Sequence, residues 1–115
     1  MSNTFLKTDR LNTAEEYSQV FKEADKFSDE FLTVLVSKKP LSSGKLGLAI
    51  AKKMVKKAVL RNQIKRIIRE AFRLNKNKLK GFDMVVLCRK KAAQASKKEL
   101  SASIKTHFDV IANNE

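Results

Sequence analysis

The first patterned stretch of the chain, residues 13–24, has the apolar period of an amphipathic helix. Its apolar side chains follow i, i+3, i+4 and i+7 spacing: Ala14, Tyr17, Val20, Phe21 and Ala24. Thr13 and Glu16 form a capping-box pattern, in which each side chain can bond a backbone N–H group that the helix leaves free. We therefore predict a first helix over about 13–24.

Two shorter runs that follow have the composition of strands. Phe31–Ser37 is apolar and β-branched, and a turn-forming segment at 38–44 follows it. Lys45–Ala51 alternates strictly, with Leu46, Leu48 and Ile50 on one face and the small residues Gly47, Ala49 and Ala51 on the other. The small face can accept a close neighbour, either a packed helix or a ligand backbone. We predict that the two runs pair antiparallel.

The longest helical pattern runs from Ala58 to about Leu74. Its apolar positions occupy one face of a helical wheel, and the opposite face holds polar and basic side chains: Asn62, Lys65, Arg66, Arg69 and Arg73. Asp83–Cys88 is a nearly continuous apolar run, which is typical of a strand covered on both faces. Strand, helix and strand over 46–88 form a βαβ unit, so these two strands are expected to be parallel neighbours.

A last amphipathic helix begins at Ser96. Ser96 and Glu99 repeat the capping-box pattern, and four apolar side chains are expected to face inward: Leu100, Ile104, Phe108 and Ile111. At 115 residues the chain fits a single domain, 1–115, with a modest core.

Charge is distributed unevenly along this pattern. The formal net charge is +13, yet residues 1–30 carry seven acidic and four basic side chains. The stretch Lys52–Arg73 holds nine basic side chains and one acid, Glu70. Because charge of one sign repels itself, an anionic partner is expected, with nucleic acid first and an anionic membrane surface second. A solvated helix face is the alternative without a partner.

Side chains suited to catalysis by the protein alone are sparse. His107 is the single histidine, and the sequence shows no evident partner to orient it. Six acids lie within residues 15–30, where they could hold a divalent ion or form a solvated helix face. Cys88 is the single cysteine, which excludes an internal disulfide and leaves strand packing or reactivity open. We predict no catalytic residue and no metal site in the protein.

No signal-peptide pattern and no apolar run of 18 residues is present, so a cytoplasmic protein is expected.

The basic helix is suited to binding a phosphate backbone. Four cations, Arg61, Lys65, Arg69 and Arg73, recur every fourth residue, about 6 Å apart along the helix. This is close to the spacing of successive phosphates, which Arg can grip with two hydrogen bonds. The Asn62 amide can both donate to and accept from a base edge or a 2′-hydroxyl. Aromatic residues near such a helix, among them Tyr17 and Phe21, can either pack in the core or stack on unpaired bases.

The segment Arg61–Glu70, RNQIKRIIRE, resembles the RNR-x-KR-x-x-R signature of the bacterial ribonuclease P protein family. Other segments resemble that family in the same order: Arg10-Leu11 with Glu16-Tyr17 and Val20-Phe21, then Leu46–Lys53, then Ala71–Arg73 and Asp83–Val86. The resemblance implies an α+β sandwich in the order αβββαβα, similar to the second domain of ribosomal protein S5. It also implies a left-handed βαβ crossover, against the usual rule, and one further strand near residues 31–51.

The family resemblance also implies a function. The protein would be the subunit of an endoribonuclease whose RNA performs catalysis, with ribonuclease P RNA and precursor tRNA as partners and neither a membrane nor a small-molecule substrate. Mg²⁺ held mainly by RNA phosphates would activate the water that removes the 5′ leader.

The residues that match the family's RNA-binding signature are Lys52, Lys53, Arg61, Asn62, Lys65, Arg66 and Arg69. The neighbouring cations Lys56, Lys57 and Arg73 complete the predicted RNA-binding set. The resemblance also implies that Tyr17, Phe21 and Phe31 lie at the cleft that receives the single-stranded leader.

Two departures from the family pattern are visible. Gln63 replaces the usual second Arg of the signature, which removes a charge, and Tyr17 replaces the commoner Phe. Two other hypotheses stay open: a general RNA-binding or ribosomal protein on the same fold, and peripheral membrane binding through the basic helix. The second has little support because the apolar stripe lacks Trp.

Overall fold

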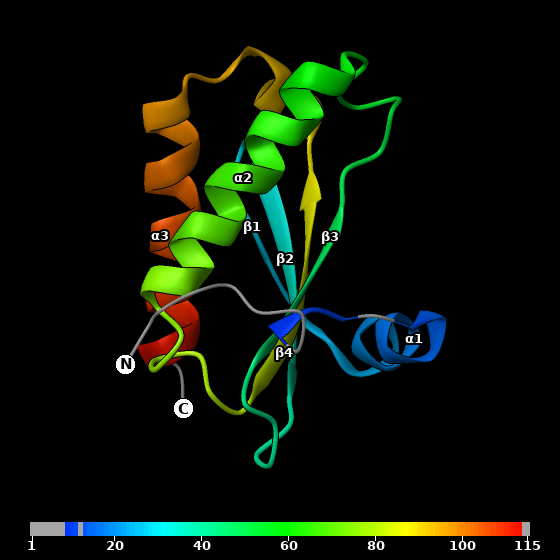
Figure 1. Cartoon of the computed structure of the whole chain (residues 1–115), viewed down its shortest axis with the longest axis vertical. Helices are drawn as coiled ribbons and strands as arrows, with labels where there is room; N and C mark the ends of the chain where they lie inside the picture. The colour runs from blue at the N-terminus through cyan, green and yellow to red at the C-terminus, as the bar shows by residue number, and fades with distance from the viewer. Residues whose placement is uncertain (1–8, 12, 114–115) are drawn as a thin grey trace.

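The computed structural model describes residues 9–11 and 13–113, which form a four-stranded sheet with helices on both faces (Figure 1). The elements are α1 (Ala14–Glu23), β1 (Asp25–Ser28), β2 (Leu32–Lys38), β3 (Lys45–Ala49), α2 (Ala58–Leu74), β4 (Phe82–Cys88), a 3₁₀ helix (Lys90–Gln94) and α3 (Lys97–Asn113). This order confirms the αβββαβα arrangement. Within the described part, no helix has the length and apolar content needed to cross a bilayer.

The strands are arranged in the order β1-β2-β4-β3. β3 runs parallel to β4, which confirms the expected βαβ neighbours, and β2 runs antiparallel to β4. The predicted pairing of β2 with β3 is wrong because β4 lies between them. β4 is apolar on both faces, so it is buried most completely in the interior of the sheet. If β2 had paired with β3, β4 would have been an edge strand with one side unpaired.

Strand β1 is the strand that the hydrophobic pattern does not reveal. The expectation of a hidden strand near 31–51 is corrected here, because the extra strand is Asp25–Ser28, directly after α1. It lies at the edge of the sheet, and only Phe27 of its four residues packs against the core. Four mostly exposed residues are too few to produce a recognisable alternation.

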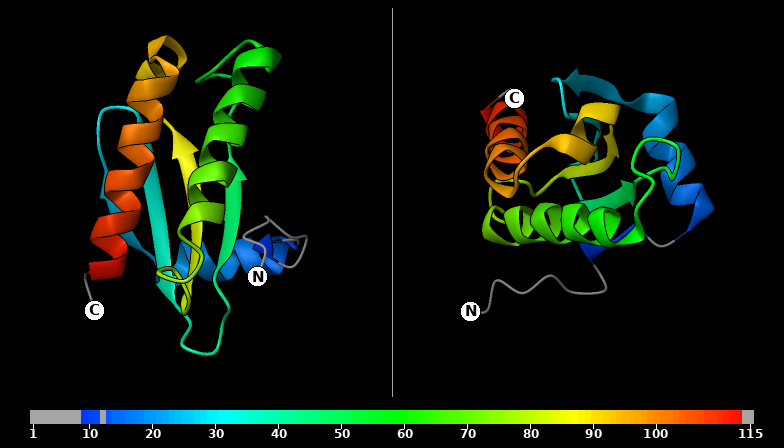
Figure 2. Two further views of the ribbon diagram at one scale, coloured as in Figure 1. Left: turned by 60° about the vertical axis from the view of Figure 1, so that its left-hand side comes forward. Right: turned by 90° about the horizontal axis from the view of Figure 1, so that it is seen from above.

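The connection from β3 through α2 to β4 is left-handed. In the left view of Figure 2, β3 and β4 both point upward, α2 passes in front of the sheet, and β4 lies to the left of β3. A right-handed crossover would place β4 on the right. The handedness implied by the family resemblance is therefore confirmed.

The larger core lies between the sheet and the pair α2 and α3. The apolar stripes predicted for both helices are buried there, including Ile64, Ile68, Phe72, Leu100, Ile104, Phe108 and Ile111. Phe72 of α2 meets Phe108 of α3 edge to face, with 6.1 Å between ring centroids. Cys88 faces this core, and burial raises the pKa of its thiol to about 11. The reactive thiolate is therefore scarce at neutral pH, which favours packing as the role of Cys88.

Helix α1 covers the opposite face of the sheet, as the right view of Figure 2 shows. A smaller cluster of Leu11, Val20 and Val85 is buried there. The predicted capping box is present: the Thr13 hydroxyl accepts from the Glu16 N–H at 3.1 Å, and the Glu16 carboxylate accepts from the Thr13 N–H at 3.2 Å. Local capping thus starts α1 where the sequence indicates.

Candidate nucleic-acid interface

A turn shaped by one buried residue presents four lysines ahead of α2. The Val55 side chain is fully buried, and the N–H groups of Met54 and Val55 both donate to the Ala51 carbonyl at 3.1 Å. The four lysines on either side of Val55 are exposed: Lys52, Lys53, Lys56 and Lys57. We refer to residues 52–57 as the lysine turn. It places four ammonium groups at the N-terminal end of α2, where the helix dipole adds to the positive potential.

Arg61 supports this turn from the first helical turns of α2. Its Nη1 atom donates to the carbonyls of Val55 and Lys56, at 3.0 and 2.8 Å. Part of the guanidinium group is therefore bonded to backbone, and only its remaining N–H groups could contact a phosphate. Positioning the lysine turn is a role that the sequence pattern does not reveal.

The other cations along α2 have different surroundings. Arg73 forms an ion pair with Glu70 one turn earlier, and its hydrogen bond lowers the pKa of the Glu70 carboxyl. Asn62 and Arg66 are exposed, whereas Lys65 and Arg69 are partly covered and lie toward α1. The four cations that recur every fourth residue, which were predicted to follow a phosphate backbone, therefore have distinct neighbours.

Lys65 and Arg69 line a small hollow of about 100 Å³ between α2, β3 and α1. The residues around it are Arg10, Leu11, Tyr17, Leu46, Leu48, Lys65 and Arg69. We call this the Tyr17 hollow. It combines one aromatic ring and three cations with apolar side chains, and these are the groups that hold an unpaired nucleotide by stacking and by phosphate contact.

Tyr17 approaches the sheet closely because residue 47 is glycine. A Cβ atom at Gly47 would lie 2.7 Å from Cε1 of the Tyr17 ring, far inside normal contact distance. The small-residue face of β3 thus accepts an aromatic side chain of a packed helix, which is one of the two neighbours that its composition allows.

Arg10 is a member of this site that was not among the predicted site residues. The Leu11 N–H donates to the Leu46 carbonyl at 3.1 Å, and this bond lays residues 9–11 along the outer edge of β3. Burial lowers the pKa of the Arg69 guanidinium, and the nearby charge of Arg10 lowers it further. Two close guanidinium groups favour an anion between them. The match of Arg10-Leu11 to the family pattern was the signal that could have identified it.

The three aromatic residues predicted for the leader cleft lie in two places. Tyr17 and Phe21 are one helical turn apart on α1, and Phe21 is 49% exposed. Phe31 precedes β2 and packs against the larger core on the α2 and α3 side of the sheet. The structure therefore brings Tyr17 and Phe21 together and gives Phe31 the contacts of a core residue.

A serine, an aspartate and a histidine meet at a second place in the fold. Ser103 Oγ donates to Asp29 Oδ2, and His107 Nε2 lies 3.3 Å from the same oxygen. The N–H groups of Phe31 and Leu32 both donate to Asp29 Oδ1 at 2.8 Å. His107 Nε2 is buried and forms no hydrogen bond with this carboxylate, so the imidazole has a neighbouring charge but no hydrogen bond from Nε2 that orients it, as expected.

This arrangement lacks the geometry of nucleophilic catalysis. The carboxylate lies between the other two side chains, and the Ser103 hydroxyl donates to Asp29 rather than to the imidazole. Its effect is to attach α3 to the start of β2, so we call it the Asp29 bracket. Among residues 9–11 and 13–113, no three His, Cys, Asp or Glu side chains gather in a way that could hold a metal ion.

The fold and the site together define a small α+β domain that presents a cationic helix beside an aromatic hollow. A family model described as Ribonuclease P matches residues 5–112. The chain is 45% identical over 91 residues to the ribonuclease P protein component of Vibrio cholerae, covering 79% of this chain and 77% of the relative. It is 37% identical over 107 residues to the ribonuclease P protein component of Methylococcus capsulatus, covering 93% of this chain and 84% of the relative. The chain belongs to the ribonuclease P protein family.

Solved structures agree with this assignment. The RNase P protein of Staphylococcus aureus superposes with a TM-score of 0.81 at 26% identity, covering 91% of this chain and 95% of that one. The RNase P protein of Thermotoga maritima superposes with a TM-score of 0.69 at 33% identity, covering 84% of this chain and 96% of that one. The family membership and the fold class predicted from sequence are confirmed.

Proposed function

We propose that this chain is the protein subunit of ribonuclease P and assists the endonucleolytic removal of 5′ leaders from precursor tRNA. In this role it binds the catalytic RNA and the single-stranded leader of the substrate. The observation that carries the proposal is the position of the cationic α2 helix directly beside the Tyr17 hollow.

The surface proposed for the catalytic RNA comprises the lysine turn and the exposed face of α2. Its side chains are mostly cations without a specific base preference, which suits contact with a folded phosphate backbone. Asn62 is exposed on the same helix and offers a neutral amide to a base edge or a 2′-hydroxyl. Binding at this surface is expected to weaken steeply as salt is raised.

The Tyr17 hollow is the proposed site of the leader. The Tyr17 ring can stack on one unpaired base, and the exposed Phe21 ring one turn further along α1 can extend the stack. Lys65 and Arg69 lie at the same hollow, where they can contact the phosphates that join these bases. Recognition of this kind tolerates many leader sequences, because each base has an aromatic face.

In the proposed holoenzyme, water breaks the phosphodiester bond and leaves a 5′-phosphate on the mature tRNA and a 3′-hydroxyl on the leader. Mg²⁺ bound mainly by RNA phosphates would supply the activated water. The contribution of this chain is to hold the leader relative to the RNA, which lowers the entropic cost of reaching the reactive geometry. Its proposed location is the cytoplasm, next to newly transcribed precursors.

Reconstitution tests the proposal. Ribonuclease P RNA and a precursor tRNA are incubated at low Mg²⁺ with and without the full chain, and 5′-phosphate tRNA is measured. We expect the chain to restore cleavage and to bind precursor more tightly than mature tRNA. No effect on cleavage would contradict the proposal. Equal affinity for the two tRNAs, without stimulated cleavage, would instead favour a general RNA-binding protein on the same fold.

A further inference from the structure

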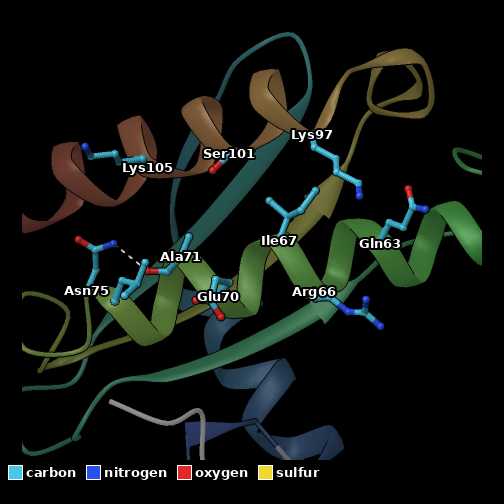
Figure 3. Close-up of a pocket in the computed structure, with 10 residues that line it drawn as sticks. Gln63, Arg66, Ile67, Glu70, Ala71, Asn75, Lys97, Ser101 and Lys105 are labelled. Atoms are coloured by element: carbon cyan, nitrogen blue, oxygen red, sulfur yellow. Dashed lines mark hydrogen bonds between the residues drawn. The ribbon is translucent and has the colours of Figure 1, made fainter. Parts of the chain in front are cut away.

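Helix α2 also borders a second and larger depression, on the side that faces α3. This groove has a volume of about 650 Å³, and the described residues that line it belong to α2, to the position that follows it and to α3 (Figure 3). We call it the α2–α3 groove. It is separate from the Tyr17 hollow, since none of the described residues lines both.

The floor of the α2–α3 groove is apolar. Ile67 and Ala71 of α2 line it and are partly buried, and Leu74 at the end of the helix is 61% exposed. An apolar floor of this kind favours a flat, uncharged group of low hydration, and a nucleobase has those properties.

The rim of the groove is cationic. Arg66 lines it from α2, and Lys97 and Lys105 line it from α3. None of these three forms an ion pair with another of the described residues. Glu70 is the one acid among the described residues that line the groove. It is paired with Arg73, so its negative charge is already balanced and attracts a further cation only weakly.

Two neutral polar side chains also line the groove. Gln63 lines the groove from α2 and Ser101 lines it from α3. Figure 3 shows Gln63 and Lys97 at one end of the groove and Lys105 at the other. The Gln63 amide can donate and accept at once, as recognition of a base edge requires.

We propose that the α2–α3 groove binds an unpaired nucleotide of the ribonuclease P RNA. The base lies on Ile67 and Ala71 with its edge toward Gln63, and the flanking phosphates contact Arg66 and Lys97. Arg66 is exposed on α2 and also lines the groove, so an RNA strand bound along α2 reaches the groove without a break. This inference rests on the proposed function, which supplies the RNA.

Charge complementarity favours RNA over the other possible occupants. A second copy of this chain would bring a net charge of +13 to a rim that is already cationic. A helix of another protein would have to supply acids for Arg66, Lys97 and Lys105 together. A nucleotide brings its negative charge and its apolar surface in one unit.

Filling the groove is the first test. Ser101→Trp places a large side chain over the floor, and Thr106→Trp is the matched control, because Thr106 is also exposed on α3 but lines a different depression. Affinity of the full chain for ribonuclease P RNA is measured at fixed salt, with thermal melting as a check on folding. We expect roughly a tenfold loss for Ser101→Trp, as for one lost stacked base, and about wild-type affinity for Thr106→Trp.

A pair of adjacent lysines gives the second test. Lys97 lines the groove and Lys98 does not, although both are exposed and carry the same charge. Lys97→Ala is expected to lower affinity and to reduce the salt slope by about one unit, whereas Lys98→Ala leaves both near wild type. Equal losses for the two variants would indicate diffuse attraction and would overturn the inference.

A photo-crosslinking residue at position 101 identifies the occupant. With the two RNAs labelled separately, we expect a crosslink to an unpaired nucleotide of ribonuclease P RNA. A crosslink to precursor tRNA alone, or a change of oligomeric state in Ser101→Trp with RNA affinity intact, would overturn the inference. If wild type stimulates cleavage and Ser101→Trp binds RNA equally well, the groove fails while the proposed function stands. If wild type binds no ribonuclease P RNA, both fail.

Discussion

Tyr17 shows how one side chain can belong to both the packing and the candidate site. Its ring lies against Gly47 of β3, where any side chain would collide with it, and it packs on the cluster of Leu11, Val20 and Val85. The same residue lines the hollow that contains Lys65 and Arg69. Its position is thus set by packing, and its surroundings are those of a base-stacking residue.

The variant Tyr17→Ala separates these two roles. We expect it to weaken binding of precursor tRNA by roughly tenfold, the cost of one lost stacked base, and to leave mature tRNA much less affected. Binding of the two RNAs is compared by titration at one salt concentration. Phe31→Ala is the control, because Phe31 packs on the core: it should cost roughly 2 kcal/mol of stability and leave the precursor-to-mature ratio unchanged. Equal losses for both RNAs in Tyr17→Ala would make Tyr17 a packing residue only.

At the scale of the element, α2 carries arginines that are indistinguishable in the sequence pattern but make different contacts in the fold. Arg61 bonds the carbonyls of Val55 and Lys56 and so supports the lysine turn. Arg69 lies in the Tyr17 hollow, near Arg10. Two arginines eight residues apart on one helix therefore differ in role, the first positioning backbone and the second facing the proposed ligand.

This difference predicts opposite results for two alanine substitutions. Arg69→Ala is expected to lower RNA affinity and to reduce the slope of log affinity against log salt by about one unit, with stability nearly unchanged. Arg61→Ala leaves two carbonyls without their donor, so it should cost roughly 1–2 kcal/mol of stability. RNA titrations at several salt concentrations and urea denaturation give the two quantities. An unchanged slope in Arg69→Ala would place this side chain away from the RNA.

Across the whole molecule, ion pairs leave the positive charge of α2 largely uncompensated. Four acids of residues 1–30 pair with lysines from outside the basic stretch: Asp9 with Lys76 at 2.9 Å, Glu16 with Lys45 at 2.8 Å, Glu23 with Lys39 at 3.0 Å, and Glu30 with Lys91 at 3.5 Å. The surface pairs among them each contribute little to stability. These pairs matter because they hold the acids beside other loops and strands, where the carboxylates do not neutralise the positive charge of α2.

The Asp29 bracket connects distant parts of the chain and should make stability depend on pH. Burial raises the pKa of the Asp29 carboxyl, but hydrogen bonds from Ser103, Leu32 and Phe31 and the charge of His107 together bring it below its usual 3.8. Because the folded pKa is the lower one, the ionised carboxylate stabilises the fold above about pH 4. This contribution is lost as the pH falls through the folded pKa.

Asp29→Asn tests the bracket. At pH 6 we expect the variant to be less stable than wild type by roughly 1.5–3 kcal/mol, the range for hydrogen bonds to a charged group. The difference should shrink toward pH 3, as wild type loses the charge that the variant never had. Urea denaturation at both pH values measures it, with Glu30→Gln as a control at the neighbouring exposed acid. A difference that is constant with pH would show that the Asp29 charge does not stabilise the fold.

Local signals in the sequence determined the helices and the character of the site. The bounds of α2 and the capping boxes of α1 and α3 follow from residues within about one turn of each other, because helical hydrogen bonds and caps are local. The charge of residues 52–73 indicated an anionic partner, and the family signature lies in the same stretch. The central strand β4 was recognisable because its apolar run requires cover on both faces.

Only the tertiary structure decided which distant residues meet. The place of β4 between β2 and β3, the edge strand β1, and the contact of Tyr17 with Gly47 join residues far apart in the chain. So do the Asp29 bracket and the α2–α3 groove, where Gln63 and Ser101 line the same space. Such contacts depend on strand register and on how the helices pack, and neither is encoded in the period of any single segment. The sequence by itself therefore determined that a cationic helix exists, and the fold decided that this helix lies between the Tyr17 hollow and the α2–α3 groove.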